Sequence, residues 1–443
     1  MPAMRPGRHL YTSRRGRNWR LTGILLLVAT VGAGIFFGIR LLSSWIGPDS
    51  EGSTAFPSSS PTPRCPTASA GGAAPLGAVA WVRAGALYLV DLETCDERTL
   101  VPKGVSAPVR FSQDGAWIAF GNGMIVPARG GTAQSPLGEL TSWRWSPRND
   151  VLVGVTADGG VVLGGPTVER RVLLPDGSRA GHVAFSPGGH SVAVDIEGNR
   201  VQVVGVSGGR PTTLYRVAPG TKAPPQVVGW SPDGRWVVFF SRFAHRIGVP
   251  LNAAPTVGGA WANVFDPVLP YPDFLSWCGK ALVLSGGAEE QPSQGSQILL
   301  SGPPMWRFTN LSNDFTRSWL WPACSADGRW IAATVTPNRA ETPPGRGVRS
   351  LWLLATGGQA RVRLTDRADA AYELPRWSAD GRFILVVRRG LAPDSPGVLL
   401  LLRVTPSSGK ARRVPGVVAR LGPASGDGGH ADWSGVTDWY RPR

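Results

Sequence analysis

Residues 230–236 read Trp-Ser-Pro-Asp-Gly-Arg-Trp, and this stretch predicts a tight turn between two β-strands. Pro232 fixes φ at the first turn position, and Gly234 can adopt the positive φ that a bulged hairpin requires. Residues 236–240 are apolar at every position, which is typical of a strand in a sheet that is covered on both faces. The stretch therefore predicts a strand–turn–strand unit inside a covered sheet.

Versions of this sequence motif recur along the chain. Each version is anchored by a Trp, Phe or Cys at one of positions 111, 145, 185, 230, 277, 324, 377 and 433. The mean spacing is 46 residues, which is the period of four-stranded propeller blades. An apolar strand follows each anchor but the last, and no stretch shows a convincing amphipathic helix. The expected fold class is therefore all-β, a closed propeller.

The two ends of the repeat region predict how the ring closes. Residues 79–100 resemble the later strands of a blade that lacks its first strand, and residues 432–440 resemble a first strand that lacks its blade. Joining them would remove two exposed sheet edges. Seven anchors and this composite blade predict eight blades. Seven blades remain the alternative if the weak unit at Trp277 or the last unit is not a full blade.

The residues before the propeller predict a membrane anchor. Residues 1–20 are basic, and residues 21–39 carry no charge and would span about 28 Å as a helix. We therefore expect a cytoplasmic tail over 1–20, a transmembrane helix over 21–46, a Gly/Pro/Ser/Ala-rich linker over 47–76 and an extracytoplasmic propeller over 77–443. A cleaved signal peptide is the alternative.

The net charge of +16 does not predict a nucleic-acid partner. Arginines outnumber lysines by 42 to 4, and they are scattered along strands and loops instead of gathering on one helix. Outside the cell, this excess of arginine favours an envelope protein or an anionic cell-wall polymer as the partner.

The repeats resemble those of TolB-like proteins. The phrase Trp-Ser-Pro-Asp-Gly-Arg-Trp, followed by a strand and a strand–Gly-Gly–strand hairpin, is similar to the TolB-like propeller repeat over residues 77–443. The resemblance implies a propeller that binds other proteins or envelope components. It does not imply a particular partner, because one fold serves many tasks.

No group of residues predicts catalysis. Residues 205–209 match Gly-x-Ser-x-Gly, but another strand follows where a nucleophile elbow needs a helix. His182, His190, His245 and His430 do not form a pair at metal-ligand spacing. We expect a binding scaffold without an enzymatic activity, a cofactor or a metal. The alternative is a sensor or enzyme that binds a sugar or small ligand at the central channel.

The four cysteines suit an oxidising compartment. Cys278 and Cys324 occupy near-equivalent positions in successive repeats, and Cys65 and Cys95 flank the entry to the first blade. We predict disulfides 278–324 and 65–95. Unpaired, buried thiols are the alternative.

Long connections between second and third strands predict a partner surface. They cover 242–259, 286–296, 336–349 and 389–396, and they join the same pair of strands in each blade, so they should emerge on one face. Tolerated insertions are the alternative. The residues assigned to this surface are Arg242, His245, Arg246, Trp261, Glu289, Glu290, Arg339, Glu341, Arg346, Arg349, Arg388 and Arg389.

Overall fold

The computed structural model describes residues 75–442, except 197, 244–246, 289–293, 339–346, 359, 393–394, 409, 414–416 and 424–431. The predicted cytoplasmic tail, transmembrane helix and nearly all of the linker therefore lie outside the described residues. No helix within the described part is long and apolar enough to cross a membrane.

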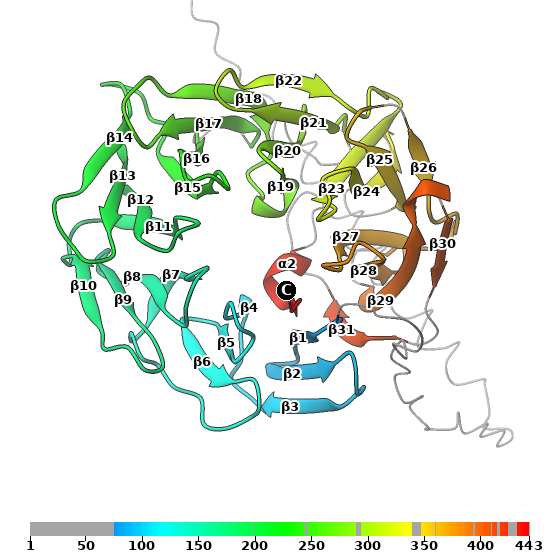
Figure 1. Ribbon diagram of the computed structural model, residues 1–443, viewed down its shortest axis with the longest axis horizontal. Helices are drawn as coiled ribbons and strands as arrows, with labels where there is room; N and C mark the ends of the chain where they lie inside the picture. Colours follow the sequence, from blue (N-terminus) through cyan, green and yellow to red (C-terminus); the bar gives the residue numbers. More distant parts are fainter. Residues whose placement is uncertain are drawn as a thin grey trace, which may run out of the picture. The chain divides into compact units, whose positions relative to one another are not determined.

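The described residues form eight sheets around a central axis (Figure 1). Every sheet is antiparallel, and we number the blades from the one that contains the first strand. Blade 1 contains β32 (Thr437–Tyr440), β1 (Ala78–Arg83), β2 (Ala86–Asp91) and β3 (Glu97–Val101), and blade 2 contains β4 (Val109–Phe111), β5 (Trp117–Phe120) and β6 (Met124–Pro127). Blade 3 contains β7 (Leu140–Trp145), β8 (Leu152–Thr156), β9 (Val161–Gly164) and β10 (Arg171–Leu174). Blade 4 contains β11 (Ala180–Phe185), β12 (Ser191–Ile196), β13 (Arg200–Gly205) and β14 (Thr212–Arg216).

Blades 5 to 8 complete the ring. Blade 5 contains β15 (Pro225–Trp230), β16 (Trp236–Ser241), β17 (Val249–Pro255) and β18 (Ala262–Val268), and blade 6 contains β19 (Leu275–Cys278), β20 (Ala281–Gly286), β21 (Gln297–Gly302) and β22 (Arg307–Asn310). Blade 7 contains β23 (Arg317–Cys324), β24 (Trp330–Pro337), β25 (Ser350–Ala355) and β26 (Arg361–Arg363). Blade 8 contains β27 (Ala371–Trp377), β28 (Phe383–Arg389), β29 (Pro396–Thr405), β30 (Lys410–Arg413) and β31 (Ala419–Pro423). Short helices cover Pro272–Phe274 (η1), Pro406–Ser408 (η2) and Trp433–Val436 (α2). The expected propeller and its eight blades are confirmed.

The repeated turn joins the first and second strands through side-chain hydrogen bonds. In blade 5, Ser231 Oγ donates to Asp233 Oδ1 (2.6 Å) and accepts the N–H of Trp236 (3.0 Å). Asp233 Oδ1 also accepts the N–H of Arg235. These bonds to the charged form hold the pKa of Asp233 below its usual value, although burial opposes the shift. The recurring aspartate therefore stabilises its own turn.

The recurring tryptophan joins neighbouring blades. Its indole Nε1 donates to the backbone carbonyl of the residue immediately before the anchor residue, in the previous blade. The pairs are Trp145 with Arg110 (3.1 Å), Trp230 with Ala184 (2.9 Å) and Trp377 with Ala323 (2.9 Å). This bond explains why tryptophan suits the anchor position, because phenylalanine lacks a donor.

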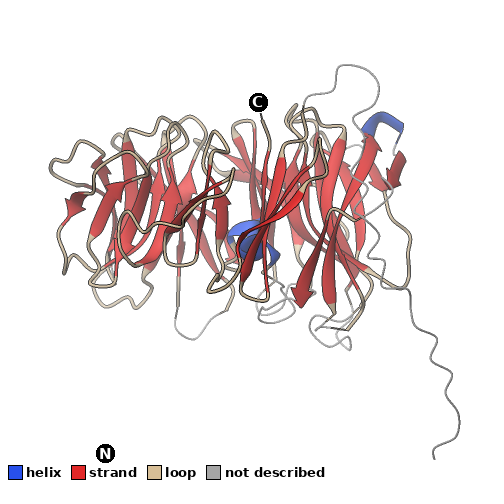
Figure 2. Ribbon diagram, turned by 90° about the horizontal axis from the view of Figure 1, so that it is seen from below, coloured by secondary structure: helices blue, strands red, loops and turns tan. Residues whose placement is uncertain are grey.

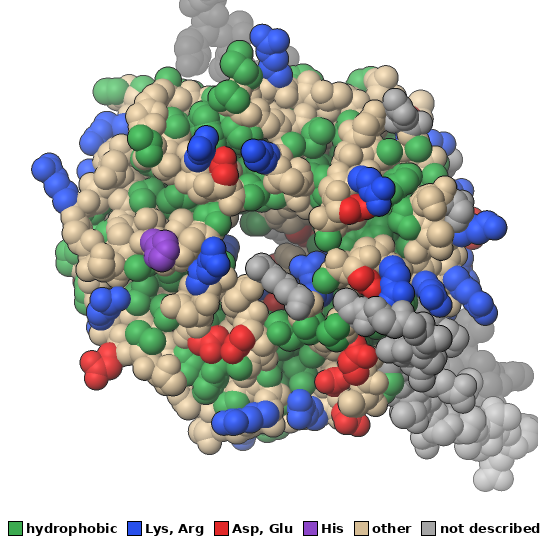
Figure 3. All heavy atoms as spheres, viewed as in Figure 1, with side chains coloured by type: hydrophobic (Ala, Val, Ile, Leu, Met, Phe, Trp, Pro, Cys, Tyr) green, Lys and Arg blue, Asp and Glu red, His purple; other side chains and the backbone are tan. Residues whose placement is uncertain are grey.

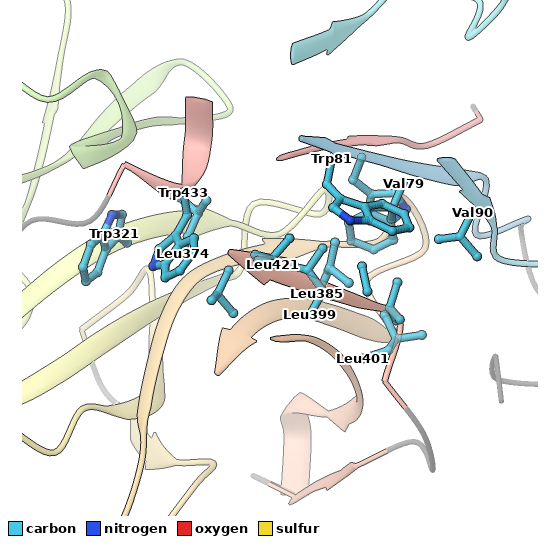
Figure 4. Packing of buried hydrophobic residues seen from close by; sticks show 14 of the residues in the cluster. Val79, Trp81, Val90, Trp321, Leu374, Leu385, Leu399, Leu401, Leu421 and Trp433 are labelled. Carbon is cyan, nitrogen blue, oxygen red and sulfur yellow. The ribbon is translucent and has the colours of Figure 1, made fainter. Parts of the chain in front are cut away.

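The ring closes as the sequence predicts. β32, from the C-terminal end, pairs with β1 and becomes the innermost strand of blade 1. A large apolar cluster seals this junction, and in Figure 4 Trp433 lies beside Leu374 and Trp321, while Trp81 and Val79 come from β1. Trp81 and Trp433 are fully buried. The closure therefore removes both sheet edges and buries a continuous core.

Three details differ from the prediction. Residues 432–440 are not one strand, because the Asp432 side chain accepts the N–H of Gly435 and caps a helical turn before β32 begins. β17 lies inside the predicted 242–259 loop. Its buried polar residue, Asn252, is satisfied because its amide donates to Ser241 Oγ. Blade 2 has three strands, and beyond β6 its described residues add only a bridge between Ile125 and Gln134.

The structure joins Cys278 and Cys324 in a disulfide between blades 6 and 7, with a Cα–Cα distance of 5.3 Å. Cys95 is half-buried after β2, and Cys65 lies outside the described residues. The 65–95 disulfide therefore stays a prediction.

Candidate functional site

The strands alternate in direction, so their connections gather at two opposite faces of the propeller (Figure 2). We call the face with the Ser-x-Asp-Gly turns the turn face, and the face with the connections between second and third strands the loop face. Arg242, Arg349, Arg388 and Arg389 lie at strand ends on the loop face. Trp261 follows β17, so it lies at the turn face and does not join them.

The remaining predicted partner residues lie outside the described residues. They are His245, Arg246, Glu289, Glu290, Arg339, Glu341 and Arg346. The structure thus brings together only part of the predicted surface, and the rest of that prediction stays a prediction.

Two of the predicted surface arginines are buried in ion pairs. Arg349 and Arg389 are 1 % and 3 % exposed, and both bind the fully buried carboxylate of Glu373 on β27. Trp433 Nε1 donates to the other oxygen of this carboxylate. Burial alone would raise the pKa of Glu373, but the two guanidinium groups and these hydrogen bonds hold it below its usual value. We call these four side chains the closed cluster, and it is not exposed to a partner.

A different group of arginines lines the centre of the ring. Arg110 on β4, Arg144 on β7 and Arg376 on β27 each occupy the position immediately before an anchor residue on an innermost strand. Asp438 on β32 precedes Trp439 in the same way. These four charged positions come from the consecutive blades 8, 1, 2 and 3, and we call them the channel arc.

The opposite side of the ring has small residues at this position. They are Ala184, Gly229, Ser276 and Ala323, in blades 4 to 7. Figure 3 shows an opening at the centre of the molecule with Lys or Arg side chains at its edge. The centre is therefore accessible from one face at least.

Hydrogen bonds hold the arc in place. Arg110 donates to the carbonyls of Val109 and Ser434, and both terminal nitrogens of Arg376 donate to the carbonyl of Thr437 at 3.1 Å. Arg144 donates to the carbonyl of Trp143. The arginines thus bond mainly to backbone oxygens, which orient a guanidinium without neutralising its charge.

The arc carries more positive than negative charge. Asp438 lies 3.7 Å from Arg376, and its other oxygen accepts the N–H of Phe111. Burial lowers the pKa of Arg144 to about 10, and the charge of Arg110 adds to the shift. Burial also lowers the pKa of Arg376 to about 10, with Asp438 opposing. Protein atoms surround Arg144, yet part of this residue remains exposed to solvent, as expected for a side chain that faces a channel. The charge of Arg110 lowers the pKa of both Arg144 and Arg376, so Arg110 repels both of these arginines.

The channel arc was not among the sites predicted from the sequence. Its signal was present, because an arginine precedes the anchor in three repeats. The general abundance of arginine hid this signal.

Comparisons with known proteins support the fold and leave the activity open. No family model and no curated protein matches the chain. Among solved structures, one described as TolB of Agrobacterium tumefaciens is 19% identical and covers 62% of this chain and 95% of its own, with a TM-score of 0.36. Porphyromonas gingivalis dipeptidyl peptidase 4 is 10% identical over 75% of this chain, which spans 57% of that enzyme, with a TM-score of 0.53. Dihydro-heme d1 dehydrogenase NirN is 16% identical and covers 83% of this chain and 78% of its own, with a TM-score of 0.52.

The eight-bladed ring itself confirms the propeller that the TolB-like repeats imply, and the matches to dipeptidyl peptidase 4 and NirN support this fold. These matches also correct the expectation that the chain is not an enzyme, because a peptidase and a dehydrogenase contain the same kind of propeller. The propeller fold therefore does not exclude catalysis.

Proposed function

We propose that this protein is a membrane-anchored, extracytoplasmic propeller scaffold that binds an anionic component of the cell envelope at its channel arc. The observation that carries the proposal is the set of three arginines, Arg110, Arg144 and Arg376, on inner strands, where Asp438 is the carboxylate that pairs with Arg376. An anionic group entering the channel would relieve the repulsion among these guanidinium groups. Arginine suits this task because its planar donors bind carboxylate or phosphate in two places.

The shape of the channel supports an extended ligand. The opening at the centre of the ring has Lys or Arg side chains at its edge, so a chain or a chain end could lie in it. An acidic segment of an envelope protein and an anionic wall polymer both have this character. The two lowered arginine pKa values give a signature: affinity should fall as pH rises through about 10, whereas ordinary exposed arginines would stay charged.

The location is proposed from the sequence. Residues 21–39 are uncharged and follow a basic segment, which favours a helix that anchors the chain with its propeller outside. The disulfide between Cys278 and Cys324 is consistent with an oxidising compartment. Protease treatment of intact cells should digest the propeller if it is outside. Protection in intact cells, and digestion only after lysis, would contradict the proposed location.

Binding is tested with the full-length protein in detergent and two defined polyanions, poly-L-glutamate and polyphosphate, with neutral dextran as the reference. We expect Arg110→Met with Arg144→Met to weaken polyanion binding more than tenfold, about 1.4 kcal/mol. The matched control is Arg403→Met with Arg412→Met, which removes two exposed arginines from β29 and β30 and should leave binding unchanged. Equal losses in both variants would show non-specific attraction to net charge and would reject the channel as the site. Inorganic phosphate that binds as tightly as polyphosphate would favour the small-ligand alternative.

A further inference from the structure

A pocket of about 420 Å³ lies on the loop face where blades 3, 4 and 5 meet. The channel arginines do not line it. Its polar lining residues are Asp158, Arg179, His182, Asp195, Gln226 and Arg242. The volume is within the usual range of small-molecule sites, and the lining combines two cations with hydrogen-bond acceptors.

A buried carboxylate orients the imidazole of this pocket. Asp195 on β12 is 3 % exposed, and its Oδ2 lies 3.1 Å from Nδ1 of His182 on β11. Asp195 also accepts the backbone N–H groups of His182 (3.1 Å) and Val227 (2.7 Å). A carboxylate that accepts from Nδ1 places the proton there, so Nε2 presents its lone pair.

The free side of the imidazole faces the pocket. The His182 side chain is 41% exposed, and its Nε2 lies 3.3 Å from the Gln226 amide nitrogen, which is a long contact. The Gln226 oxygen accepts from an Arg242 guanidinium nitrogen at 2.6 Å. The four side chains thus form a line from cation to anion across blades 4 and 5, and a ligand hydroxyl could replace the long amide contact.

The backbone around the pocket is shaped for close approach. A Cβ on Gly181 would lie 2.4 Å from Asp195 Oδ1, so glycine is what lets the carboxylate reach its place. Arg179 adopts a left-handed φ of 56°, and a Cβ on Gly159 would lie 2.7 Å from the Arg179 Cα. Residues with a strained backbone conformation are often found at binding sites.

We propose that this pocket binds a small carboxylic acid that also carries hydroxyl groups. Arg179 and Arg242 would bind the carboxylate, His182 Nε2 would accept a hydroxyl proton, and Asp158 would accept a second hydroxyl. The orientation of its imidazole by Asp195 makes His182 the specificity-determining residue for the hydroxyl, and the arginines determine the preference for an anion. This site is separate from the channel arc, so it does not depend on the proposed polyanion binding.

The probe set consists of three six-carbon compounds: D-gluconate with both groups, sorbitol with hydroxyls only, and hexanoate with a carboxylate only. Titration of the full-length protein in detergent is followed by calorimetry and by the imidazole NMR signals of its five histidines. We expect gluconate to bind with a Kd on the order of 1 mM and to shift the His182 signal, with sorbitol and hexanoate at least tenfold weaker. Gluconate binding no tighter than either reference would overturn the proposal.

Variants separate binding from a structural role. Arg242→Gln and His182→Gln should each weaken gluconate at least tenfold while the thermal midpoint stays near that of the wild type. His190→Gln, at the exposed turn of the same blade, is the matched control and should keep wild-type affinity. Arg144→Met should also keep it, since it alters only the channel. Loss of stability in His182→Gln with unchanged gluconate affinity would show that the line of side chains only joins the blades, and would reject the site.

Discussion

The closed cluster and the channel arc use the same residue type in two opposite ways. Arg349 and Arg389 share one buried carboxylate, Glu373, and their charge is internally balanced. Arg110, Arg144 and Arg376 bond mainly to backbone carbonyls, and the carboxylate of Asp438 lies 3.7 Å from Arg376. The difference teaches that burial alone does not distinguish a structural arginine from a ligand-binding one. What distinguishes them is whether a carboxylate of the chain neutralises the charge.

The two groups are also connected through the end of the chain. Glu373 and Arg376 lie on the same strand, β27, while Trp433 and Asp438 lie on the segment that closes the ring. Trp433 binds the carboxylate of the first group, and Asp438 faces an arginine of the second. Substitutions at these positions test the comparison directly.

The largest effect is expected from Glu373→Gln. It leaves two buried guanidinium groups without their counter-charge, and loss of one member of a buried ion pair costs about 3–5 kcal/mol of unfolding free energy. Urea unfolding followed by tryptophan fluorescence measures the change. The control is Asp369→Asn, because Asp369 pairs with Arg367 at the surface, and it should change nothing measurable. Equal stability of the two variants would remove the distinction between the groups.

Acid should weaken the closed cluster. The pKa of Glu373 is lowered in the folded protein, so its stabilising contribution is present above its ordinary value of 4.5 and is lost as pH falls through the folded pKa. The wild type and Glu373→Gln should therefore converge in stability as pH falls below 4.5 and through the folded pKa. The turn aspartates lose stability in the same direction, but they do so in both proteins and cancel in the difference. A difference that does not depend on pH would contradict the ionised form of Glu373.

A smaller change is expected from Asp438→Asn. The amide oxygen can still accept the Phe111 N–H, so the main loss is the partly exposed interaction with Arg376, about 0.5–1 kcal/mol. Polyphosphate affinity should rise several-fold, since the arc loses its one carboxylate. Measuring both quantities on one preparation checks the opposite signs. Weaker polyphosphate binding would indicate that Asp438 orients the arginines and does not compete with the ligand.

The smallest effect on stability is expected from Arg144→Met. Burial and Arg110 disfavour its charge, so removing it should change the unfolding free energy by less than about 0.5 kcal/mol, in the stabilising direction. Its polyanion affinity should nevertheless fall. Arg389→Met provides the contrast, because it should destabilise the protein without altering polyanion binding. A loss of stability in Arg144→Met like that of Arg389→Met would show that both arginines are structural.

Much of the fold was predictable because each blade repeats one local solution. Side chains of the Ser-x-Asp-Gly turn hydrogen-bond to the backbone of the turn itself, and the anchor tryptophan donates a hydrogen bond to the preceding blade. The spacing of these residues therefore predicts the ring. Ring closure followed from unpaired strands at both ends. The last unit was harder, because Trp433 mimics an anchor while Trp439, which lacks the following serine, occupies that position.

The candidate sites were less predictable, because they depend on which residues meet across blades. Arg349 lies in a predicted loop, and only the structure places it against Glu373, 24 residues away. His182 and Asp195 are separated by a turn and a strand, and neither forms a sequence motif. Residues before the anchor could have predicted the channel arc, had they been compared from one repeat to the next.

The closing strand also determines how the propeller would respond to a pull on its N-terminal end. The described chain enters at β1, which lies between β2 and β32 and is hydrogen-bonded along both edges. Tension applied ahead of residue 78 would act along two ladders at once, so the strand must shear from both neighbours instead of peeling away bond by bond. A propeller tethered through the residues ahead of β1 would resist mechanical load at this strand.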